Sequence, residues 1–329
     1  MDMNGKRVLV TGGTGTVGMA LVQRLLGPFP GVRQILVYSR DEQKHFEMAA
    51  KLPPAEVPVR YIVGDVRDRD RLMHACRGVD ILVHTASMKH VALSEQNPIE
   101  CAKTNIFGSH NVIDAAVAND IERVVTLTTD KAVLPINAYG ASKLFLERLF
   151  LDADHQCATK FSVVRFANVF GSKGSVVPLF LRAREQGYLP ITDPRMTRFS
   201  ITMQEAMDLI LFALEEGWGG EVIVPVSPSY RILDVAEAIA PGVEQRVMGA
   251  RPGEKIHEFM VGAHEAEQTV RLGQRLVICP KEGAWDAEGY CDRTGATRVP
   301  SGFEYDSETN SDWLTVEQIR EMLSDLADA

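Results

Sequence analysis

The chain has 329 residues, of which 45% are hydrophobic and 24% are charged. A chain of this length and composition can bury a substantial core, so we expect one large domain or two interlocked ones rather than disorder. The formal net charge of −9 provides no basic surface for nucleic acid, which we therefore exclude as a partner.

Composition also bears on location and on metals. Residues 1–7 lead directly into an apolar run, which leaves no room for a secretion signal, and no stretch approaches about 18 uninterrupted apolar residues. The five cysteines are widely scattered, and the eight histidines show no metal-ligand spacing. We therefore expect a cytoplasmic protein with reduced thiols, no membrane span and no catalytic metal.

Short apolar runs alternate with helical patterns over the first half of the chain. The runs, which we predict to be strands, cover residues 8–10, 34–38, 59–63, 81–83, 124–127 and 161–165. Their apolar continuity is typical of strands that are covered on both faces. Helical patterns cover residues 19–26, 69–76, 104–118 and 139–151. This alternation predicts an α/β fold with a Rossmann-type doubly wound parallel sheet.

The pattern becomes turn-rich after about residue 168. Helical patterns return at residues 204–214 and 233–239, and an amphipathic helix is expected over 313–323, with Thr315 as a plausible N-cap. We predict an NADP-binding Rossmann domain over residues 1–170 and a smaller C-terminal α+β substrate domain over residues 171–329. A segment near residues 200–216 is expected to return to the first domain.

A glycine-rich turn follows the first predicted strand and opens the first helix. In that context the glycines let the backbone approach a pyrophosphate, which then lies on the amides at the positive end of the helix. The cofactor contacts that we predict in this turn are Gly12, Thr14, Gly15, Thr16, Val17 and Gly18.

The end of the second predicted strand bears on the choice of cofactor. An NAD enzyme usually offers an acidic residue there to the ribose 2′-hydroxyl. This chain has Ser39 and Arg40 instead, with Lys44 one helical turn on, and these groups suit a 2′-phosphate. NADP is therefore preferred, while Asp41 keeps NAD open. Asp65, at the end of the third strand, could accept a hydrogen bond from the adenine amino group or cap the following helix.

Tyr139 and Lys143 stand at i, i+4 spacing on one predicted helix face. A tyrosinate base near neutral pH needs its pKa lowered, and nearby positive charge from Lys143 and an oxidised nicotinamide favours the ionised phenol. The pair follows the cofactor-binding half of the chain. This position favours a catalytic tyrosine and lysine over two surface residues that share the spacing by chance.

A second acid/base pair follows the strand at residues 124–127. Thr129 can hydrogen-bond the substrate hydroxyl that Tyr139 deprotonates. Asp130 and Lys131 provide a further acid and base, which simple hydride transfer does not need. They therefore point to an additional elimination step. An adjacent Asp and Lys favour each other's charged forms, so the site must separate or desolvate them before they act as neutral acid and neutral base.

The chain resembles the inverting UDP-N-acetylglucosamine 4,6-dehydratases, which are extended short-chain dehydrogenase/reductase enzymes. Lys131 stands where the retaining sugar-nucleotide 4,6-dehydratases have glutamate. The blocks that carry the resemblance run over nearly the whole chain and are Thr11 to Gly18, Tyr38-Ser39-Arg40-Asp41, Gly64-Asp65-Val66-Arg67-Asp68, Lys89-His90-Val91, Lys103-Thr104-Asn105, Thr129-Asp130-Lys131-Ala132, Pro135-Ile136-Asn137, Tyr139-Gly140-Ala141-Ser142-Lys143, Gly174-Ser175-Val176-Val177-Pro178, Arg195-Met196-Thr197-Arg198-Phe199 and Arg251-Pro252-Gly253-Glu254-Lys255.

This resemblance implies a stepwise mechanism. Tyr139 removes the C4 hydroxyl proton while the C4 hydride passes to NADP, and the resulting ketone acidifies the hydrogen on C5. Lys131 takes that proton, and Asp130 protonates the departing C6 hydroxyl. The hydride returns to C6, and protonation of C5 from the opposite face inverts that centre. The net reaction is that of a lyase.

The resemblance also implies further contacts and self-association. The expected partner is UDP-N-acetylglucosamine or a close analogue, and the chain is expected to form a homo-oligomer, either a dimer or a hexamer. Beside the groups already named, the predicted cofactor contacts are Asp65, Val66, Ala86, Lys89 and Asn105. The predicted substrate contacts are Lys89, Asn168, Val176, Val177, Arg195, Arg198, Arg251 and Glu254.

Two other functions stay open from the sequence. A sugar-nucleotide 4-epimerase or reductase of the same fold needs only Thr129, Tyr139 and Lys143, and the Asp130-Lys131 pair argues against it. A catalytically idle NADP-sensing or scaffold protein could lose Tyr139 and Lys143, yet both are present.

Overall fold

The computed structural model describes residues 2–27, 31–53, 56–172 and 174–327. Its main feature is a ten-stranded sheet. The strands of this sheet are β1 Arg7–Thr11, β2 Gln34–Ser39, β3 Val59–Val63, β4 Ile81–His84, β5 Arg123–Thr129, β6 Lys160–Phe166, β10 Val222–Pro225, β14 Thr269–Leu272, β15 Arg275–Ile278 and β16 Thr297–Arg298.

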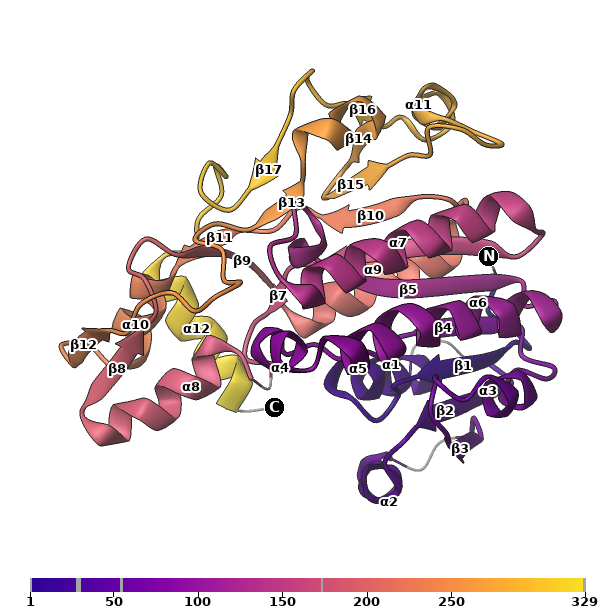
Figure 1. The fold of residues 1–329 in the computed structure, drawn as a ribbon, viewed down its shortest axis with the longest axis horizontal. Helices are drawn as coiled ribbons and strands as arrows, with labels where there is room; N and C mark the ends of the chain where they lie inside the picture. The colour runs from indigo at the N-terminus through magenta and orange to yellow at the C-terminus, as the bar shows by residue number, and fades with distance from the viewer. Residues whose placement is uncertain (1, 28–30, 54–55, 173, 328–329) are drawn as a thin grey trace.

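Helices cover both faces of the sheet (Figure 1). The α-helices are α1 Thr16–Leu26, α2 Glu42–Lys51, α3 Arg69–Ala75, α4 Val91–Gln96, α5 Pro98–Ala102, α6 Gly108–Ala118, α7 Ala138–Gln156, α8 Val176–Ala183, α9 Met203–Glu216, α10 Ile232–Ile239, α11 Ala287–Thr294 and α12 Val316–Ala327. Short helical turns are η1 Lys103–Phe107, η2 Asp130–Ala132, η3 Arg184–Gln186 and η4 Ala263–Gln268. In the described part of the chain, each helix is too short or too polar to cross a membrane.

The six predicted strands form one end of the sheet, with β3 at its edge, in the parallel order β3-β2-β1-β4-β5-β6. This order is that of a Rossmann-type doubly wound sheet, so the predicted fold class is confirmed. The four residues of β4 and the last six of β5 are buried, as expected for strands covered on both faces. β5 lies near the middle of the ten strands, so its carboxyl end is close to the middle of the edge where the parallel strands end.

The sheet continues beyond β6 with strands that the sequence did not predict. β10 runs parallel to β6, while β15, β14 and β16 add on as antiparallel strands. Each has only two to four residues, too few for the pattern to be distinguished from its turn-rich surroundings. α9 packs against β5 and β6, within the segment near 200–216 that was expected to return to the sheet. The division at residue 170 stays a prediction.

A second lobe lies beside the sheet, on the left of Figure 1. It contains α8, α10 and α12 with the strand pair β8 Tyr188–Ile191 and β12 Glu244–Val247, and it buries an apolar cluster of its own. Two small sheets, β7 Asn168–Val169 with β9 Thr197–Ile201 and β11 Ser229–Arg231, and β13 Phe259–Val261 with β17 Tyr305–Asp306, complete the fold. The structure of this half is α+β.

Two helix predictions differ in detail from the structure. The helix expected over residues 104–118 is divided into a π-helical turn, η1, followed by α6. The helix expected over 313–323 begins at Val316, and Thr315 caps it as predicted, since its hydroxyl accepts a hydrogen bond from the Gln318 amide at 3.2 Å. π-helical turns occur often at functional sites.

Candidate functional site

The candidate site starts where β5 runs into η2. Thr129 begins this turn: its hydroxyl accepts from the Lys131 amide at 3.4 Å and donates to Oδ1 of Asp130 at 2.7 Å. Asp130 is fully buried, whereas the Lys131 side chain is 21% exposed. The turn therefore fixes the carboxylate of Asp130, while part of the Lys131 side chain remains exposed.

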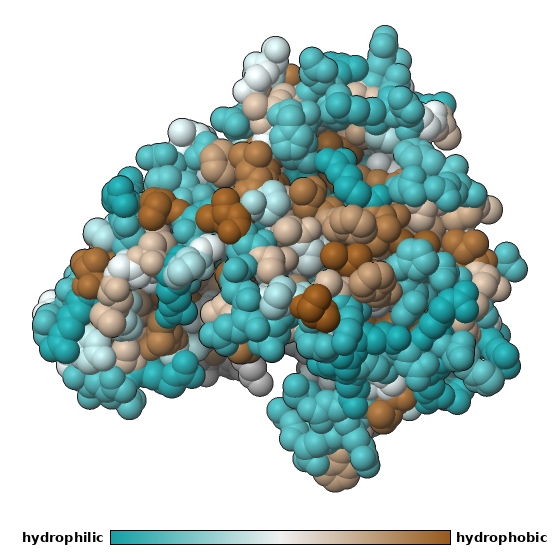
Figure 2. Space-filling view, viewed as in Figure 1, coloured by the Kyte–Doolittle hydropathy of each residue, from teal (hydrophilic) through white to brown (hydrophobic). Residues whose placement is uncertain are grey.

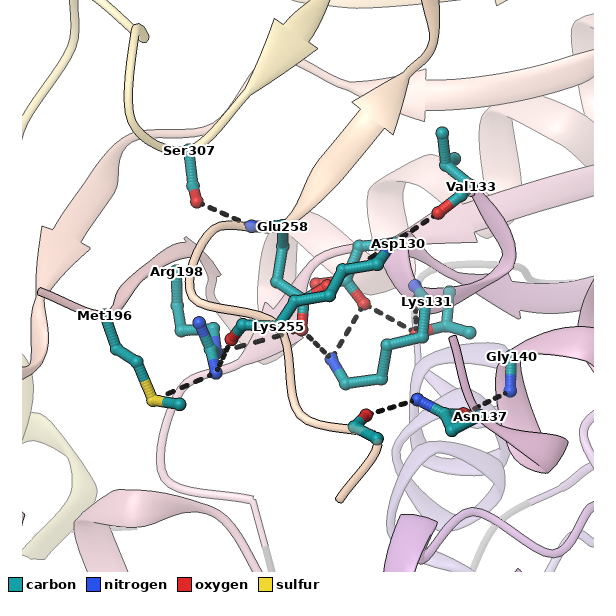
Figure 3. A network of polar contacts seen from close by, with 12 residues as sticks. Asp130, Lys131, Val133, Asn137, Gly140, Met196, Arg198, Lys255, Glu258 and Ser307 are labelled. Atoms are coloured by element: carbon teal, nitrogen blue, oxygen red, sulfur yellow. Dashed lines mark hydrogen bonds and ion pairs between the residues drawn. The ribbon is translucent and has the colours of Figure 1, made fainter. Parts of the chain in front are cut away.

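Lys131 lies between two carboxylates (Figure 3). Its Nζ is 3.0 Å from Oδ1 of Asp130 and 3.0 Å from Oε1 of Glu258, which precedes β13. Burial by itself lowers the pKa of Lys131, but Asp130 and Glu258 more than offset burial and raise it. The site therefore desolvates the Asp130-Lys131 pair without separating it, and Lys131 is an ammonium in this structure.

Two further cations surround Glu258. Arg198 Nε is 3.8 Å from Oε1 of Glu258, and Lys255 Nζ is 4.0 Å from Oε2. Lys255 also donates a hydrogen bond to the Val133 carbonyl, just after η2. Oδ2 of Asp130 and Oε2 of Glu258 are buried without a hydrogen-bond partner in the described residues. These two oxygens are available to a proton or to a ligand.

α7 brings Tyr139 to the same turn. The Asn137 side chain caps α7 by accepting from the Gly140 amide at 2.7 Å. A Cβ at residue 140 would lie 2.2 Å from the Lys131 carbonyl oxygen, so only glycine lets the helix begin this close to η2. The Tyr139 phenol lies close enough to Thr129, Asp130 and Lys131 for each of them to shift its pKa. The three groups predicted to act on the sugar therefore converge.

The electrostatics of α7 differ from the simple expectation. Burial raises the pKa of Tyr139 to about 12, and Lys131 is the leading cation that opposes this rise. Burial lowers the pKa of Lys143 to about 8 against the attraction of Glu147. Lys143 donates from Nζ to the Leu127 carbonyl at 2.7 Å. From the sequence we expected Lys143 to stabilise the ionised phenol of Tyr139. In the structure, Lys131 is the cation that lowers the pKa of this phenol most.

The glycine turn between β1 and α1 has the shape that a dinucleotide needs. Gly12 has φ +66°, and a Cβ there would lie 2.7 Å from the Ala86 Cα. A Cβ at Gly18 would lie 2.5 Å from the Gly13 Cα. Because Gly15 is the N-cap of α1 and brings no side chain, the first amides of the helix face no side-chain cap. These residues fit the pyrophosphate of a nicotinamide dinucleotide.

The residues predicted to meet the adenosine end lie after β2. Thr14 and Ser39 exchange a hydrogen bond of 2.6 Å between hydroxyls. The Arg40 side chain is 60% exposed, with Nη1 3.8 Å from Oδ2 of Asp65. Asp41 is the N-cap of α2 and accepts from the Lys44 amide at 3.2 Å. One Asp41 oxygen is therefore already used for capping, while Arg40 is exposed and makes a long ion pair with Asp65.

Asp65 does not cap a helix, since Asp68 caps α3. It forms an ion pair with Arg67, whose Nη2 lies 2.6 Å from Oδ2. Burial raises the pKa of Asp65, but its hydrogen bonds from Arg67 outweigh burial and hold the pKa below its usual value. Asp65 is thus a negatively charged acceptor at the end of β3, beside Val66.

Asn105 supports the loop after β4. It has no exposed surface, and its amide accepts from the Met88 amide at 2.8 Å and donates to the Met88 carbonyl at 3.0 Å. It also donates to the Ser142 hydroxyl at 2.9 Å. Asn105 therefore fixes the backbone just before the exposed Lys89, and ties it to α7.

The structure brings some of the predicted substrate residues together and not others. Arg198 joins the cluster of Asp130, Lys131 and Glu258, and Asn168 lies close enough to the buried Tyr230 to lower its pKa. Val177 is 2% exposed and packs in the second lobe, behind Val176.

Two predicted arginines lie apart from that cluster. Arg195 pairs with Asp193 and lines a surface groove with Arg231 and Trp313. The Arg251 side chain is 65% exposed, with its Nη1 4.0 Å from Oε1 of Glu254. The loop that carries Arg251 and Glu254 is held to the start of α7, because Asn137 donates a hydrogen bond to the Gly253 carbonyl at 2.7 Å.

Sequence reasoning missed three members of the site, namely Lys255, Glu258 and Tyr230. Lys255 closes one of the blocks that carry the resemblance, and Glu258 follows three residues later. No periodic pattern marks this segment, because it is irregular up to β13. Its distance along the chain from Lys131 hides the contact.

Comparisons with known proteins agree with this geometry. A family described as "Polysaccharide biosynthesis protein" matches residues 8–280. The inverting UDP-N-acetylglucosamine 4,6-dehydratase of Campylobacter jejuni subsp. jejuni serotype O:23/36 (strain 81-176) is 40% identical over 98% of both chains. A UDP-glucose 4-epimerase of Rickettsia bellii (strain RML369-C) is 36% identical over 98% of this chain and 96% of its own.

Solved structures share the fold. Pen from Bacillus thuringiensis is 32% identical over 99% of both chains, with a TM-score of 0.90. DesIV, a dTDP-glucose 4,6-dehydratase from Streptomyces venezuelae with NAD bound, is 23% identical over 76% of this chain and 86% of its own, with a TM-score of 0.69. That second likeness shows the fold alone. The chain belongs to the polysaccharide biosynthesis protein family of extended short-chain dehydrogenase/reductase enzymes.

Proposed function

We propose that the protein is a sugar-nucleotide 4,6-dehydratase that acts on UDP-N-acetylglucosamine and inverts C5. The observation that carries this proposal is the contact of Asp130 and Lys131 beside Tyr139 at the end of β5. A 4-epimerase needs an oxidising site but no additional acid and base for elimination. The greater identity to the dehydratase relative than to the epimerase relative supports the same choice.

The cofactor that we propose is NADP, held by the glycine turn and by Ser39, Arg40 and Lys44. When bound, the nicotinamide supplies a reversible two-electron oxidation at C4 of the sugar and the matching reduction at C6. An exposed guanidinium suits a 2′-phosphate, and the side chain of Arg40 is 60% exposed. The DesIV structure holds NAD, so the preference for NADP rests on these side chains.

Tyr139 is the base for the C4 hydroxyl. Its phenol is buried beside Thr129, so both oxygens can reach one sugar hydroxyl. A buried phenol at a pKa of about 12 is a weak acid, and ionising it requires positive charge nearby. Lys131 supplies part of that charge, and Lys143, buried one helical turn along α7, is the next cation, on the same helix as the phenol.

Lys131 and Asp130 then carry the elimination. Passing one proton from Lys131 Nζ to Asp130 across the 3.0 Å contact produces a neutral amine and a neutral acid, with no proton taken from solvent. The amine removes the proton on C5, which the C4 ketone has acidified, and Asp130 donates its proton to the departing C6 hydroxyl. The pair then returns to the charged state in which it started. C5 takes one proton from solvent on the opposite face, and Tyr139 releases to solvent the proton that it took from the C4 hydroxyl, so the net reaction is the loss of one water.

Mass spectrometry of the product tests this function. Purified protein incubated with UDP-N-acetylglucosamine is expected to give a sugar nucleotide lighter by one water. An isomer of unchanged mass would instead identify a 4-epimerase. Because the cofactor ends in the redox state in which it began, the reaction is expected to proceed without added NADP when the protein retains it.

We further propose a cytoplasmic homo-oligomer, either a dimer or a hexamer. Three apolar side chains that are more than half exposed lie on the neighbouring segments α5, η1 and α7. They are Ile99, Phe107 and Phe145. Figure 2 shows apolar side chains gathered near the middle of the face on which α5, α6 and α7 lie. Light scattering after gel filtration is expected to give a mass above that of one chain.

A further inference from the structure

Asp130 and Lys131 form the elimination pair of the proposed reaction. Glu258 is a deeply buried charged residue that contacts this pair, and the proposed reaction gives it no role. It is 1% exposed. Ser307 holds its backbone from both sides: the Glu258 amide donates to the Ser307 hydroxyl at 2.9 Å, and the Ser307 amide donates to the Glu258 carbonyl at 2.9 Å. The Ser307 hydroxyl is in turn 2.7 Å from that of Thr197. Glu258 is therefore held by its surroundings and cannot turn away to solvent.

The side chain of Glu258 is directed at Lys131. One oxygen, Oε1, is 3.0 Å from Lys131 Nζ, while Oε2 is buried and has no hydrogen-bond partner in the described residues. Figure 3 shows Lys131 reaching between Asp130 and Glu258, with Arg198 on the far side of Glu258 and Lys255 running past Glu258 to the Val133 carbonyl. A buried carboxylate costs free energy unless it is paired, so this placement requires a compensating role or contact.

We propose that Glu258 is a positioning residue for the elimination step: its carboxylate holds the Lys131 amine beside Asp130 and restrains that amine from releasing its proton. The inference rests on the proposed dehydratase function, in which Lys131 is the base for C5. Glu258 does not touch the sugar in this account. It acts through Lys131, which must leave the ammonium form before it can accept the C5 proton.

Two separate contributions of Glu258 follow from the geometry. As a hydrogen-bond acceptor it fixes where Lys131 Nζ lies, because without it a flexible lysine has only Asp130 to hold it. As a negative charge 3.0 Å away it stabilises the ammonium over the amine. Glutamine retains the acceptor and removes the charge, whereas alanine removes both, so the two substitutions separate the contributions.

The charge of Lys131 is set by groups from several elements. Asp130 and Glu258 favour the ammonium, while Arg198 disfavours it. Lys255 also lies close enough to interact with Lys131, as do the phenols of Tyr139 on α7 and Tyr230 on β11. Removing one negative charge from this set makes the loss of a proton from Lys131 easier. The pH–rate profile of elimination must then move to lower pH.

The test compares wild type, Glu258→Gln and Glu258→Ala as full-length protein with bound cofactor and UDP-N-acetylglucosamine. Absorbance of the reduced cofactor in a single turnover reports oxidation at C4, and mass spectrometry reports dehydration. For Glu258→Ala we expect dehydration at least ~10-fold slower, with oxidation within about twofold of wild type. For Glu258→Gln we expect the pH profile of dehydration to move down by about one pH unit or more.

Glu304→Gln is the matched control. Glu304 is an exposed carboxylate just before β17, the strand that pairs with β13, and the substitution is expected to leave both steps and the pH profile unchanged. Equal losses of oxidation and dehydration in both Glu258 variants would indicate a structural role and overturn the inference, as would variants indistinguishable from wild type. If wild type gave only an isomer, the proposed function itself would be wrong, and the wild-type reaction alone would reveal it.

Discussion

Asp130 and Lys131 are the residues on which the proposed elimination depends, and their contact has two consequences. The sequence predicted that the pair must be separated or desolvated, and the structure shows desolvation with the two groups in contact at 3.0 Å. A proton can therefore pass directly between them. The second carboxylate, Glu258, makes the charged state of Lys131 the resting state.

Replacing Lys131 with glutamine separates oxidation from elimination. Glutamine cannot remove the C5 proton, and loss of a general base typically slows its step by ~10²–10⁴-fold. Oxidation at C4 requires Tyr139, which loses the positive charge of Lys131 in this variant but keeps Lys143 one helical turn away. Oxidation is therefore expected to slow much less than elimination, and reduced cofactor is expected to accumulate in a single turnover. Asp130→Asn is expected to behave similarly, because the C6 hydroxyl loses its acid. Loss of cofactor reduction in Lys131→Gln would contradict this division of roles.

Arg40 is expected to decide between the two dinucleotides. Arg40→Ala removes a charge-assisted contact to the 2′-phosphate and should weaken NADPH binding by ~10–100-fold, with little change for NADH. Isothermal titration with both cofactors measures the difference. Arg60→Ala, on the exposed side of β3, is the control. Equal weakening for NADH and NADPH would mean that Arg40 does not contact the phosphate.

At the scale of elements, a buried ion network fastens α7 to the sheet and to η4. Arg165 on β6 is 1% exposed and pairs with Glu147 of α7 at 2.8 Å and with Glu265 of η4 at 2.9 Å. Thr128, on the neighbouring β5, donates to the same Glu147. Since Glu147 lies one turn from Lys143, the network also fixes the helix that carries the catalytic phenol.

Arg165→Met is expected to lower the free energy of unfolding by ~3–5 kcal/mol, because two buried carboxylates lose their partner. Urea unfolding monitored by circular dichroism measures this loss. Arg246→Ala, which removes an exposed pair with Glu244, is the control and should not move the midpoint. A midpoint for Arg165→Met as high as that of the control would show that the network does not stabilise the fold.

Glu221, at the start of β10, introduces a pH dependence into stability. Burial raises its pKa to about 7, despite hydrogen bonds from Ser162 and the Trp218 amide. The folded protein therefore binds a proton that the unfolded chain releases near its ordinary pKa, so this group makes stability fall as pH rises from about 4.5 to 7.

Glu221→Gln removes that titration. Relative to the variant, wild type is expected to lose roughly 2–3 kcal/mol of unfolding free energy between pH 5 and pH 8. Urea titrations of both proteins at the two pH values measure the difference. A constant difference between the two proteins at both pH values would show that Glu221 is ionised throughout.

What the sequence could predict depends on how local the signal is. The six apolar runs and the tail helix with its Thr315 cap were readable because each pattern is complete within a short window. Thr129, Asp130 and Lys131 were readable for the same reason, since they follow directly on β5. Glu258 meets Lys131 only after the chain has folded, and no local pattern reports such a contact.

At the scale of the whole molecule, the two halves of the chain build one site. The sheet supplies the glycine turn, η2 and α7, while the segment before β13 and strand β9 supply Glu258 and Arg198. The cofactor residues lie along one edge of the sheet, because the carboxyl ends of its parallel strands meet there. The elimination pair therefore lies where that edge meets the second half of the chain.

Mass spectrometry of the sugar product formed in deuterated water tests the central claim most directly. Wild-type protein with its own bound cofactor is expected to convert UDP-N-acetylglucosamine to a product that has lost one water and gained one deuterium at C5. That result requires oxidation, elimination and protonation of C5 in one site. An isomer of unchanged composition, or a dehydrated product without deuterium at C5, would contradict the account.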